Sequence, residues 1–134
     1  MICKTDTGYP ERMPKEDWVT VDVITMAAPD LRASSNRGKA RSADGSYMSN
    51  AELFACHVSR AIHMLTVAAA RGADVLVLGA FGCGAFENDP EVVARAYKVA
   101  LQEFPKVFRR IEFAVYCGAY ESPNYTAFSH TLLP

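Results

Sequence analysis

One strand–loop–helix unit constrains the fold of this chain more than any other feature of the sequence. Val75–Leu78 is a short continuous apolar run, which is the pattern of a strand covered on both faces. A glycine-rich turn follows at 79–86, and Asp89-Pro90 then has the pattern of a helix N-cap with proline at the first helical position. A buried strand that leads through such a turn into a helix is typical of an α/β sheet.

The segments on either side predict further strands and helices in alternation. Residues 18–26 are apolar and β-branched and are expected to form a buried strand. Ser49 and Glu52 form a capping box, after which an apolar stripe with helical period runs to a stop at Gly72. A third strand is expected at 111–117. Because strands separated by helices run parallel, this order predicts a layered α/β sheet.

The rest of the chain has no such periodicity. Residues 1–17 are polar and are expected to form an irregular lead-in, and the tail from 118 to 134 has no clear period. Residues 32–48 are expected to form a flexible basic loop. Its four cations are Arg32, Arg37, Lys39 and Arg41. Such a loop could close over an anionic ligand, but a charge run is more often a solvated surface.

The composition excludes several classes of protein. With 134 residues the chain is expected to be one domain, and with 50% hydrophobic residues it is not disordered. A net charge of -1 is not that of a dedicated nucleic-acid or anionic-membrane binder. The first residues lack the apolar core of a signal peptide, so a cytoplasmic protein is expected. The cysteines and histidines lack metal-site spacing, so no metal and no cofactor is expected.

The glycine-rich turn is the strongest candidate for a binding site. Glycines at 79, 82 and 84 let backbone amides converge on one point, and the following helix adds its unpaired N–H groups. This arrangement suits a phosphate or diphosphate. The spacing is neither a Walker A motif nor the dinucleotide fingerprint. A tight turn whose glycines only relieve packing is the alternative interpretation.

A second interpretation of the same turn makes Cys83 a nucleophile. A helix N-terminus close to the thiol would favour the thiolate. However, a nucleophile elbow has glycine two residues to either side, and here those positions are Phe81 and Ala85. A small buried residue in a turn is therefore the favoured interpretation of Cys83.

Two stretches of the sequence resemble a known family. Residues 79–94 resemble the diphosphate-loop signature of the microbial (bacterial-type) poly(ADP-ribose) glycohydrolases, a branch of the macrodomains. Residues 23–31 resemble the strand and Ala-Ala-Pro turn that precede it in that family. The resemblance covers about residues 1–130. It implies a macrodomain-like three-layer α/β/α fold with a mostly parallel sheet, a single domain over 1–134 that lacks the family's N-terminal strands and catalytic segment.

The resemblance also implies a ligand and the residues that contact it. The ligand is ADP-ribose or poly(ADP-ribose). The loop from Gly82 to Phe86 would wrap the diphosphate, Phe86 would pack beside the distal ribose, and Phe128 would stand near the adenine. The ligand-binding residues implied in this way are Ala28, Pro29, Gly79, Ala80, Phe81, Gly82, Cys83, Gly84, Ala85, Phe86, Asn88 and Phe128.

The family's catalytic motif has no match in this sequence. In the family, a glycine triplet followed by Gln-Glu-Glu lies N-terminal to the residues matched here. The chain has no Gly-Gly and no Glu-Glu, and Gln102-Glu103 lies inside the second predicted helix. Of the carboxylates near the loop, Asp89 is expected to cap a helix. Glu87 remains as a candidate acid, although an anion beside a diphosphate is unfavourable unless protonated.

Three functions remain open from the sequence. The first is an ADP-ribose-binding module without its own hydrolase motif. The second is an active ADP-ribose glycohydrolase that another chain or a complementing N-terminal segment completes. The third is a structural fragment that self-associates as a homo-oligomer, because few strands leave sheet edges and apolar faces open.

Overall fold

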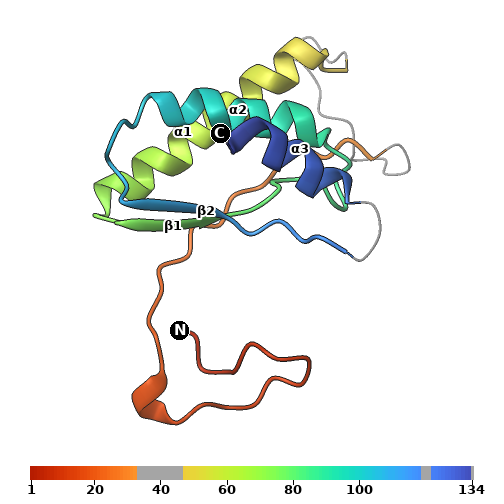
Figure 1. The fold of residues 1–134 in the computed structure, drawn as a ribbon. Helices are drawn as coiled ribbons and strands as arrows, with labels where there is room; N and C mark the ends of the chain where they lie inside the picture. The colour runs from red at the N-terminus through yellow and green to blue at the C-terminus, as the bar shows by residue number, and fades with distance from the viewer. Residues whose placement is uncertain (33–46, 119–121, 134) are drawn as a thin grey trace.

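A computed structural model describes residues 1–32, 47–118 and 122–133 of the chain (Figure 1). The basic loop predicted at 32–48 lies outside these ranges except for Arg32 and its last two residues. In chain order the elements are the 3-10 helix η1 (Lys15–Asp17), the helix α1 (Asn50–Ala70), the strand β1 (Val75–Leu78), the helix α2 (Pro90–Gln102), the strand β2 (Arg110–Phe113) and the helix α3 (Pro123–Leu132).

The centre of the fold is a parallel β1–α2–β2 unit, as the sequence predicts. β1 and β2 pair in parallel, with Val75 opposite Arg110 and Leu78 opposite Phe113. Among the described residues these two strands form the whole sheet. All three α-helices lie on one side of it (Figure 1), and α1 and α3 both pack against α2. The described residues thus form two layers, and the third layer of the expected fold is not among them.

The helix boundaries follow from local capping. The Ser49 side chain accepts from the Glu52 amide while Glu52 reaches back, so the predicted capping box is confirmed. Gly72 follows α1 with a φ of 72°, which completes the predicted stop. Asp89 caps α2 by accepting from the Glu91 amide at 2.8 Å. The helix α3 was not predicted, because its sequence has no clear apolar period.

The strand predicted at 18–26 is wrong. Val19 makes one isolated antiparallel bridge to Ile2, and residues 20–32 belong to no strand. Val23 is 79% exposed. Figure 1 shows this segment as an extended connection between the N-terminal residues and the layered body. A β-branched sequence favours extended backbone, but a strand also needs a neighbour for its backbone groups, and beyond Val19 the described chain supplies none here.

The prediction that β1 is covered on both faces is also wrong. Leu76 and Leu78 face the helices and are 9% exposed, whereas Val75 and Val77 are 41% and 66% exposed. The cause is the placement of all three α-helices on one side of the sheet (Figure 1). β2 is shorter than the strand predicted at 111–117, because regular pairing with β1 stops at Phe113.

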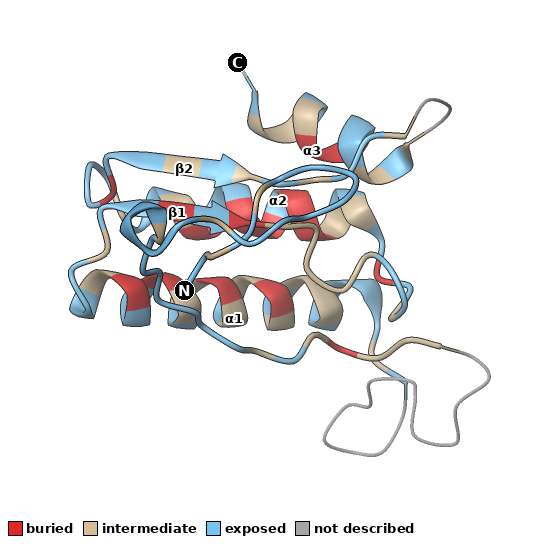
Figure 2. Cartoon of the chain, turned by 90° about the horizontal axis from the view of Figure 1, so that it is seen from below, coloured by how far each residue is buried: buried red, intermediate tan, exposed pale blue. Residues whose placement is uncertain are grey.

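The core lies between α1, α2 and the inner face of the sheet. Figure 2 shows the buried residues of α1 and α2 along the sides that face each other. Ala61 and Leu65 of α1 meet Val93 and Tyr97 of α2 in one cluster, which β1 and α3 complete. By length and composition, α1 is the one helix among the described residues that could cross a membrane. Core helices pass the same test, and α1 packs its buried stripe on α2.

Candidate functional site

The glycine-rich loop between β1 and α2 folds into consecutive tight turns. The amide of Cys83 donates to the carbonyl of Ala80 at 3.0 Å. The amide of Glu87 then donates to Gly84 at 3.0 Å, and the amide of Asn88 donates to Gly82 at 3.1 Å. These bonds close the loop onto itself directly after the carboxyl end of β1. Ligands of parallel α/β sheets bind at this end of the strands.

Gly82 is the position in the loop where a side chain cannot fit. Its φ is 79°, in the left-handed region that favours glycine. An added Cβ would lie 2.6 Å from the Ala28 Cβ and 2.7 Å from the Asn88 Nδ2. By contrast, a Cβ on Gly84 would meet nothing within 4 Å. The close approach at Gly82 brings the predicted site residue Ala28 against the loop.

A buried asparagine joins the loop to the segment that passes it. Asn88 is 3% exposed. Its Nδ2 lies within hydrogen-bond distance of three carbonyl oxygens, those of Pro29 at 2.7 Å, Gly82 at 3.0 Å and Phe86 at 3.3 Å. The amide of Leu31 also donates to the Phe86 carbonyl at 3.0 Å. Asn88 therefore holds the loop closed and fixes the 29–31 segment beside it.

The fourth partner of Asn88 is a buried histidine of α1. The Oδ1 of Asn88 lies 2.9 Å from the Nε2 of His57. Since Nδ2 already faces three acceptors, Oδ1 accepts and the His57 Nε2–H donates. His57 was not among the site residues predicted from the sequence. It lies one turn before Ala61, on the buried side of α1, is 3% exposed, and meets the Phe81 ring edge-on. Its Nδ1 has no hydrogen-bond partner among the described residues.

The surroundings of His57 favour its neutral form. Burial lowers the pKa of the ring, and the nearby Arg60 lowers it further, while the bond to Asn88 opposes both. Arg60 also donates to the carbonyl of Ala27, so α1 holds the 27–31 segment from a second point. A neutral ring keeps its Nε2–H for Asn88 without placing a charge in the core.

We expect folding stability to fall as the pH drops below about 6.5, the ordinary pKa of histidine. In that range the unfolded chain takes up a proton that the buried His57 resists, so acid favours unfolding until the pH passes the lowered pKa. Asp30 also has a lowered pKa, because Arg32 bonds to it, but its contribution is lost only in stronger acid. Thermal unfolding at about pH 7.5 and 5.5 measures the slope. The same slope in His57→Gln would contradict the assignment.

A cation lies at the outer end of the loop. Arg32 pairs with Asp30 at 2.7 Å and places its guanidinium 5.2 Å from the centre of the Phe86 ring. Glu87 adds a further attraction to Arg32. Arg32 was predicted from the sequence only as part of the basic loop. The structure brings it to the edge of the candidate site, where its charge suits an anionic ligand.

The environment of Cys83 does not favour a nucleophile. Burial raises the pKa of its thiol to about 11, with Asp89 adding to the effect. The Sγ atom lies 3.8 Å from the carbonyl of Phe81. A thiol held protonated at neutral pH is a poor nucleophile. These features agree with Cys83 as a small half-buried residue of the turn.

The two carboxylates that follow the loop have different surroundings. Asp89 is engaged in the N-cap of α2, as predicted. Glu87 is exposed and has a φ of 57°, a conformation that a non-glycine residue rarely adopts. The tight turn that ends at Asn88 imposes this conformation, because the Glu87 amide bonds back to Gly84.

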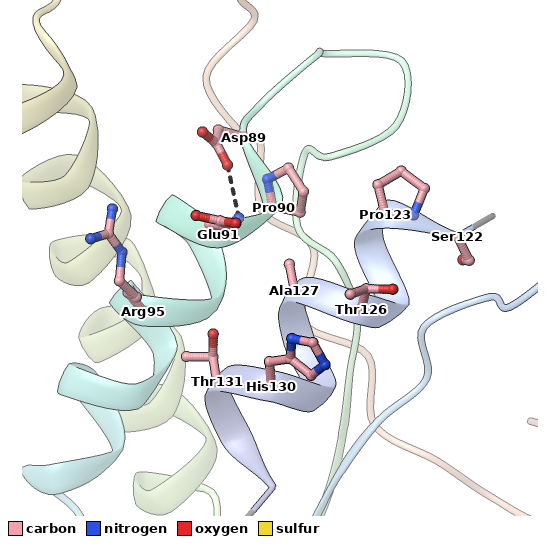
Figure 3. Close-up of a pocket in the computed structure, with 10 residues that line it drawn as sticks. All are labelled: Asp89, Pro90, Glu91, Arg95, Ser122, Pro123, Thr126, Ala127, His130 and Thr131. Atoms are coloured by element: carbon pink, nitrogen blue, oxygen red, sulfur yellow. Dashed lines mark hydrogen bonds between the residues drawn. The ribbon is translucent and has the colours of Figure 1, made fainter.

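A groove of about 740 Å3 lies beside this region, between α2 and α3 (Figure 3). The carboxylates of Asp89 and Glu91 line it together with Arg95 on α2 and His130 on α3. No residue of the 79–88 loop lines it. Its carboxylates disfavour an anionic ligand, so the groove is not part of the candidate site.

Phe128 lies apart from the other predicted site residues. It is 3% exposed and packs its ring against Tyr97 and Phe113, with ring centres 6.3 Å and 5.7 Å away. This is a core position on the buried face of α3, and contact with an adenine stays a prediction. The loop, Ala28, Pro29 and Asn88 are brought together. The apolar stripe predicted for this helix left His57 out, and the spacing of one turn from Ala61 is the signal that could have found it.

Comparison with known proteins finds similar solved structures. No protein-family model and no curated protein matches the chain. Among solved structures, the poly(ADP-ribose) glycohydrolase from Deinococcus radiodurans in complex with ADP-ribose matches with a TM-score of 0.58 and 29% identity. That match covers 69% of this chain and 48% of that chain. This chain resembles the bacterial poly(ADP-ribose) glycohydrolases. The resemblance inferred from residues 79–94 and 23–31 is thereby confirmed.

A second glycohydrolase shows the same extent of similarity. The enzyme from Thermomonospora curvata matches with a TM-score of 0.58 and 28% identity, over 69% of this chain and 43% of that chain. The apo form of the Deinococcus enzyme matches at 30% identity over the same share of this chain. The chain spans a little under half the length of these glycohydrolases. The match supports a mixed α/β fold related to part of theirs.

Proposed function

We propose that the chain binds ADP-ribose through the glycine loop, with the diphosphate held by backbone amides. One observation carries the proposal. The N–H groups of Gly84, Ala85 and Phe86 donate to no other described residue, although the turns on both sides of them are closed by hydrogen bonds. Three consecutive unpaired donors on a fixed turn form a concave site for an anion.

The surroundings of these donors suit a diphosphate more than a neutral ligand. Gly84 and Ala85 are exposed, so a ligand can reach them without displacing a side chain. Arg32 places a guanidinium beside Phe86, and the Asp30 carboxylate that pairs with it offsets part of its charge. The end of α2 contributes less than the sequence suggests, because Asp89 already occupies the Glu91 amide and carries a negative charge. The similarity to glycohydrolases crystallised with ADP-ribose supports the choice of ligand.

Titration calorimetry with ADP-ribose tests the proposal. Heat of binding is expected with ADP-ribose and with ADP, which share the diphosphate, and not with adenosine, which lacks it. A thermal shift should accompany the heat, because a ligand that binds the folded state stabilises it. The absence of both heat and thermal shift at millimolar ADP-ribose would overturn the proposal for this chain.

Glycohydrolase activity is a separate proposal that depends on finding an acid. Glycosidic cleavage needs a carboxylic acid to protonate the leaving oxygen. Asp89 is engaged as a helix cap, which leaves Glu87 as the exposed carboxylate next to the loop. Incubation with poly(ADP-ribose) would show whether free ADP-ribose is released. Loss of that release in Glu87→Ala would assign the acid to Glu87.

The outer face of the sheet favours a second candidate function, self-association. Val75 and Val77 are exposed on this face, and each strand has one free edge among the described residues. Arg110 and Glu112 flank the valines on the same face. A two-fold pair of copies would bury the valines, and Arg110 and Glu112, which form an ion pair with each other within one copy, would bring no unpaired charge to the contact. A second copy of this chain is therefore the occupant that we assign to the face.

We expect Val77→Asp to weaken this association by about tenfold or more, because a carboxylate would be buried without a partner. Light scattering at increasing concentration measures it against the monomer mass of 14.7 kDa. The matched control is Val107→Asp, since Val107 is also an exposed valine but lies between α2 and β2. A wild-type chain that stays monomeric would rule out this candidate.

A further inference from the structure

We propose that His57 is a positioning residue for the ligand loop, and that it acts by fixing the orientation of the Asn88 amide. For the ligand, this inference rests on the proposed function. The effect of His57 on the shape of the loop does not depend on the proposed function, because its hydrogen bond to Asn88 is present in the protein without ligand. His57 belongs to α1 and not to the loop, and it reaches the loop through a hydrogen bond of 2.9 Å to Asn88 and an edge contact with the Phe81 ring.

The Asn88 amide has an oxygen at one end, which faces His57, and a nitrogen at the other, which faces backbone carbonyls. A side-chain amide can turn over and exchange its oxygen with its nitrogen at little cost in shape. In the reverse orientation the oxygen of Asn88 would face the carbonyls of Pro29, Gly82 and Phe86. The Nε2–H of His57 selects the observed orientation, because a donor there requires the oxygen of the amide.

In the observed orientation, the Asn88 amide holds two carbonyls of the loop in place. The carbonyls of Gly82 and Phe86 both point toward the Asn88 nitrogen. They fix the peptide planes at the two ends of the 83–86 span, and thereby the direction of the unpaired N–H groups between them. Without Asn88 in this orientation, the loop carbonyls lose a buried donor and the peptide planes can rotate.

His57 is a polar residue at a buried position of α1. The ring is buried, and its Nδ1 has no hydrogen-bond partner among the described residues. A position that needed only volume would be filled at lower cost by leucine or phenylalanine. The polar edge of the ring is used at Asn88, and the edge contact with Phe81 holds the ring in register with it.

The test compares two apolar variants, His57→Leu and His57→Phe, with His57→Gln, which carries a nitrogen donor at nearly the same reach. Residue-resolved amide exchange by NMR is measured without ligand, and ADP-ribose affinity by calorimetry. In the apolar variants we expect the amides of Glu87 and Asn88 to exchange about tenfold faster, with α2 core amides unchanged, and affinity to fall about tenfold. His57→Gln should restore most of both. His63→Leu, at an exposed site on the same helix, is the matched control.

The results of this comparison either support or overturn the positioning role of His57. Unchanged loop exchange in both apolar variants overturns the proposal, and so does faster exchange spread evenly over α1 and α2, which would mark His57 as a core residue only. If one apolar variant does not fold, the other and His57→Gln carry the comparison. If the wild-type chain binds no ADP-ribose but loop exchange still responds to His57, the positioning role stands and the proposed function fails.

Discussion

Gly82→Ala is expected to destabilise the protein by about 3 kcal/mol and to abolish binding of ADP-ribose. A left-handed backbone costs a residue with a Cβ roughly 1–2 kcal/mol, and overfilling a packed site costs roughly 1–3 kcal/mol more. Both costs apply here, since the φ is 79° and the new Cβ would lie 2.6 Å from the Ala28 Cβ. For a chain of this length the loss lowers the Tm by roughly 10 °C.

The strain would fall on the contacts that shape the site. To admit a methyl group, either Ala28 or Asn88 must move, and both hold the loop against the passing segment. The matched control is Gly84→Ala, where the added Cβ meets nothing within 4 Å. That variant should stay within about 0.5 kcal/mol of the wild type. Equal losses of Tm in the two variants would show that the close approach at Gly82 does not shape the loop.

Apart from the parallel β1–α2–β2 unit, which follows from the order of strands and helices, the parts of the fold that could be predicted are those set by neighbouring residues. Ser49 with Glu52 begins α1, Asp89 caps α2, and Gly72 ends α1, and each of these signals acts within one helical turn. The glycine loop was located for the same reason, because its turns close over short spans. Periodicity and capping are local properties, so one sequence is enough to find them.

Apart from α3, whose sequence lacks a local apolar period, the failures involve contacts between distant residues. The segment at 18–26 has the composition of a strand, yet beyond the Val19 bridge to Ile2 its backbone groups have no strand partner among the described residues. Val75 and Val77 have the composition of a fully covered strand, yet the helices lie on the other face. The hydrogen bond between His57 and Asn88 joins residues 31 positions apart in the sequence, and no local pattern predicts it. Both the unpaired segment and the open face occur in a chain that spans a little under half the length of its structural relatives.

Asn88→Asp is expected to destabilise the protein by at least about 3 kcal/mol, since leaving a buried polar group without its partner costs about 1–3 kcal/mol each. The substitution keeps the size and replaces the Nδ2 donor with an oxygen. The carbonyls of Pro29, Gly82 and Phe86 would then face an acceptor instead of a donor. The oxygen that accepts from His57 is retained, so the loss of stability reports on the hydrogen bonds that the Asn88 nitrogen makes to the three carbonyls.

The control for this change is Asn50→Asp, because Asn50 is exposed in the first turn of α1 and a carboxylate near a helix N-terminus is tolerated or favourable. Urea unfolding of both variants gives the two free energies of unfolding with their m-values. A loss at Asn88 as small as that at Asn50 would mean that the three carbonyls find other donors when the amide is gone. The loop would then keep its shape through its own turns, and the direction of the unpaired amides of Gly84–Phe86 would not depend on contacts with the core.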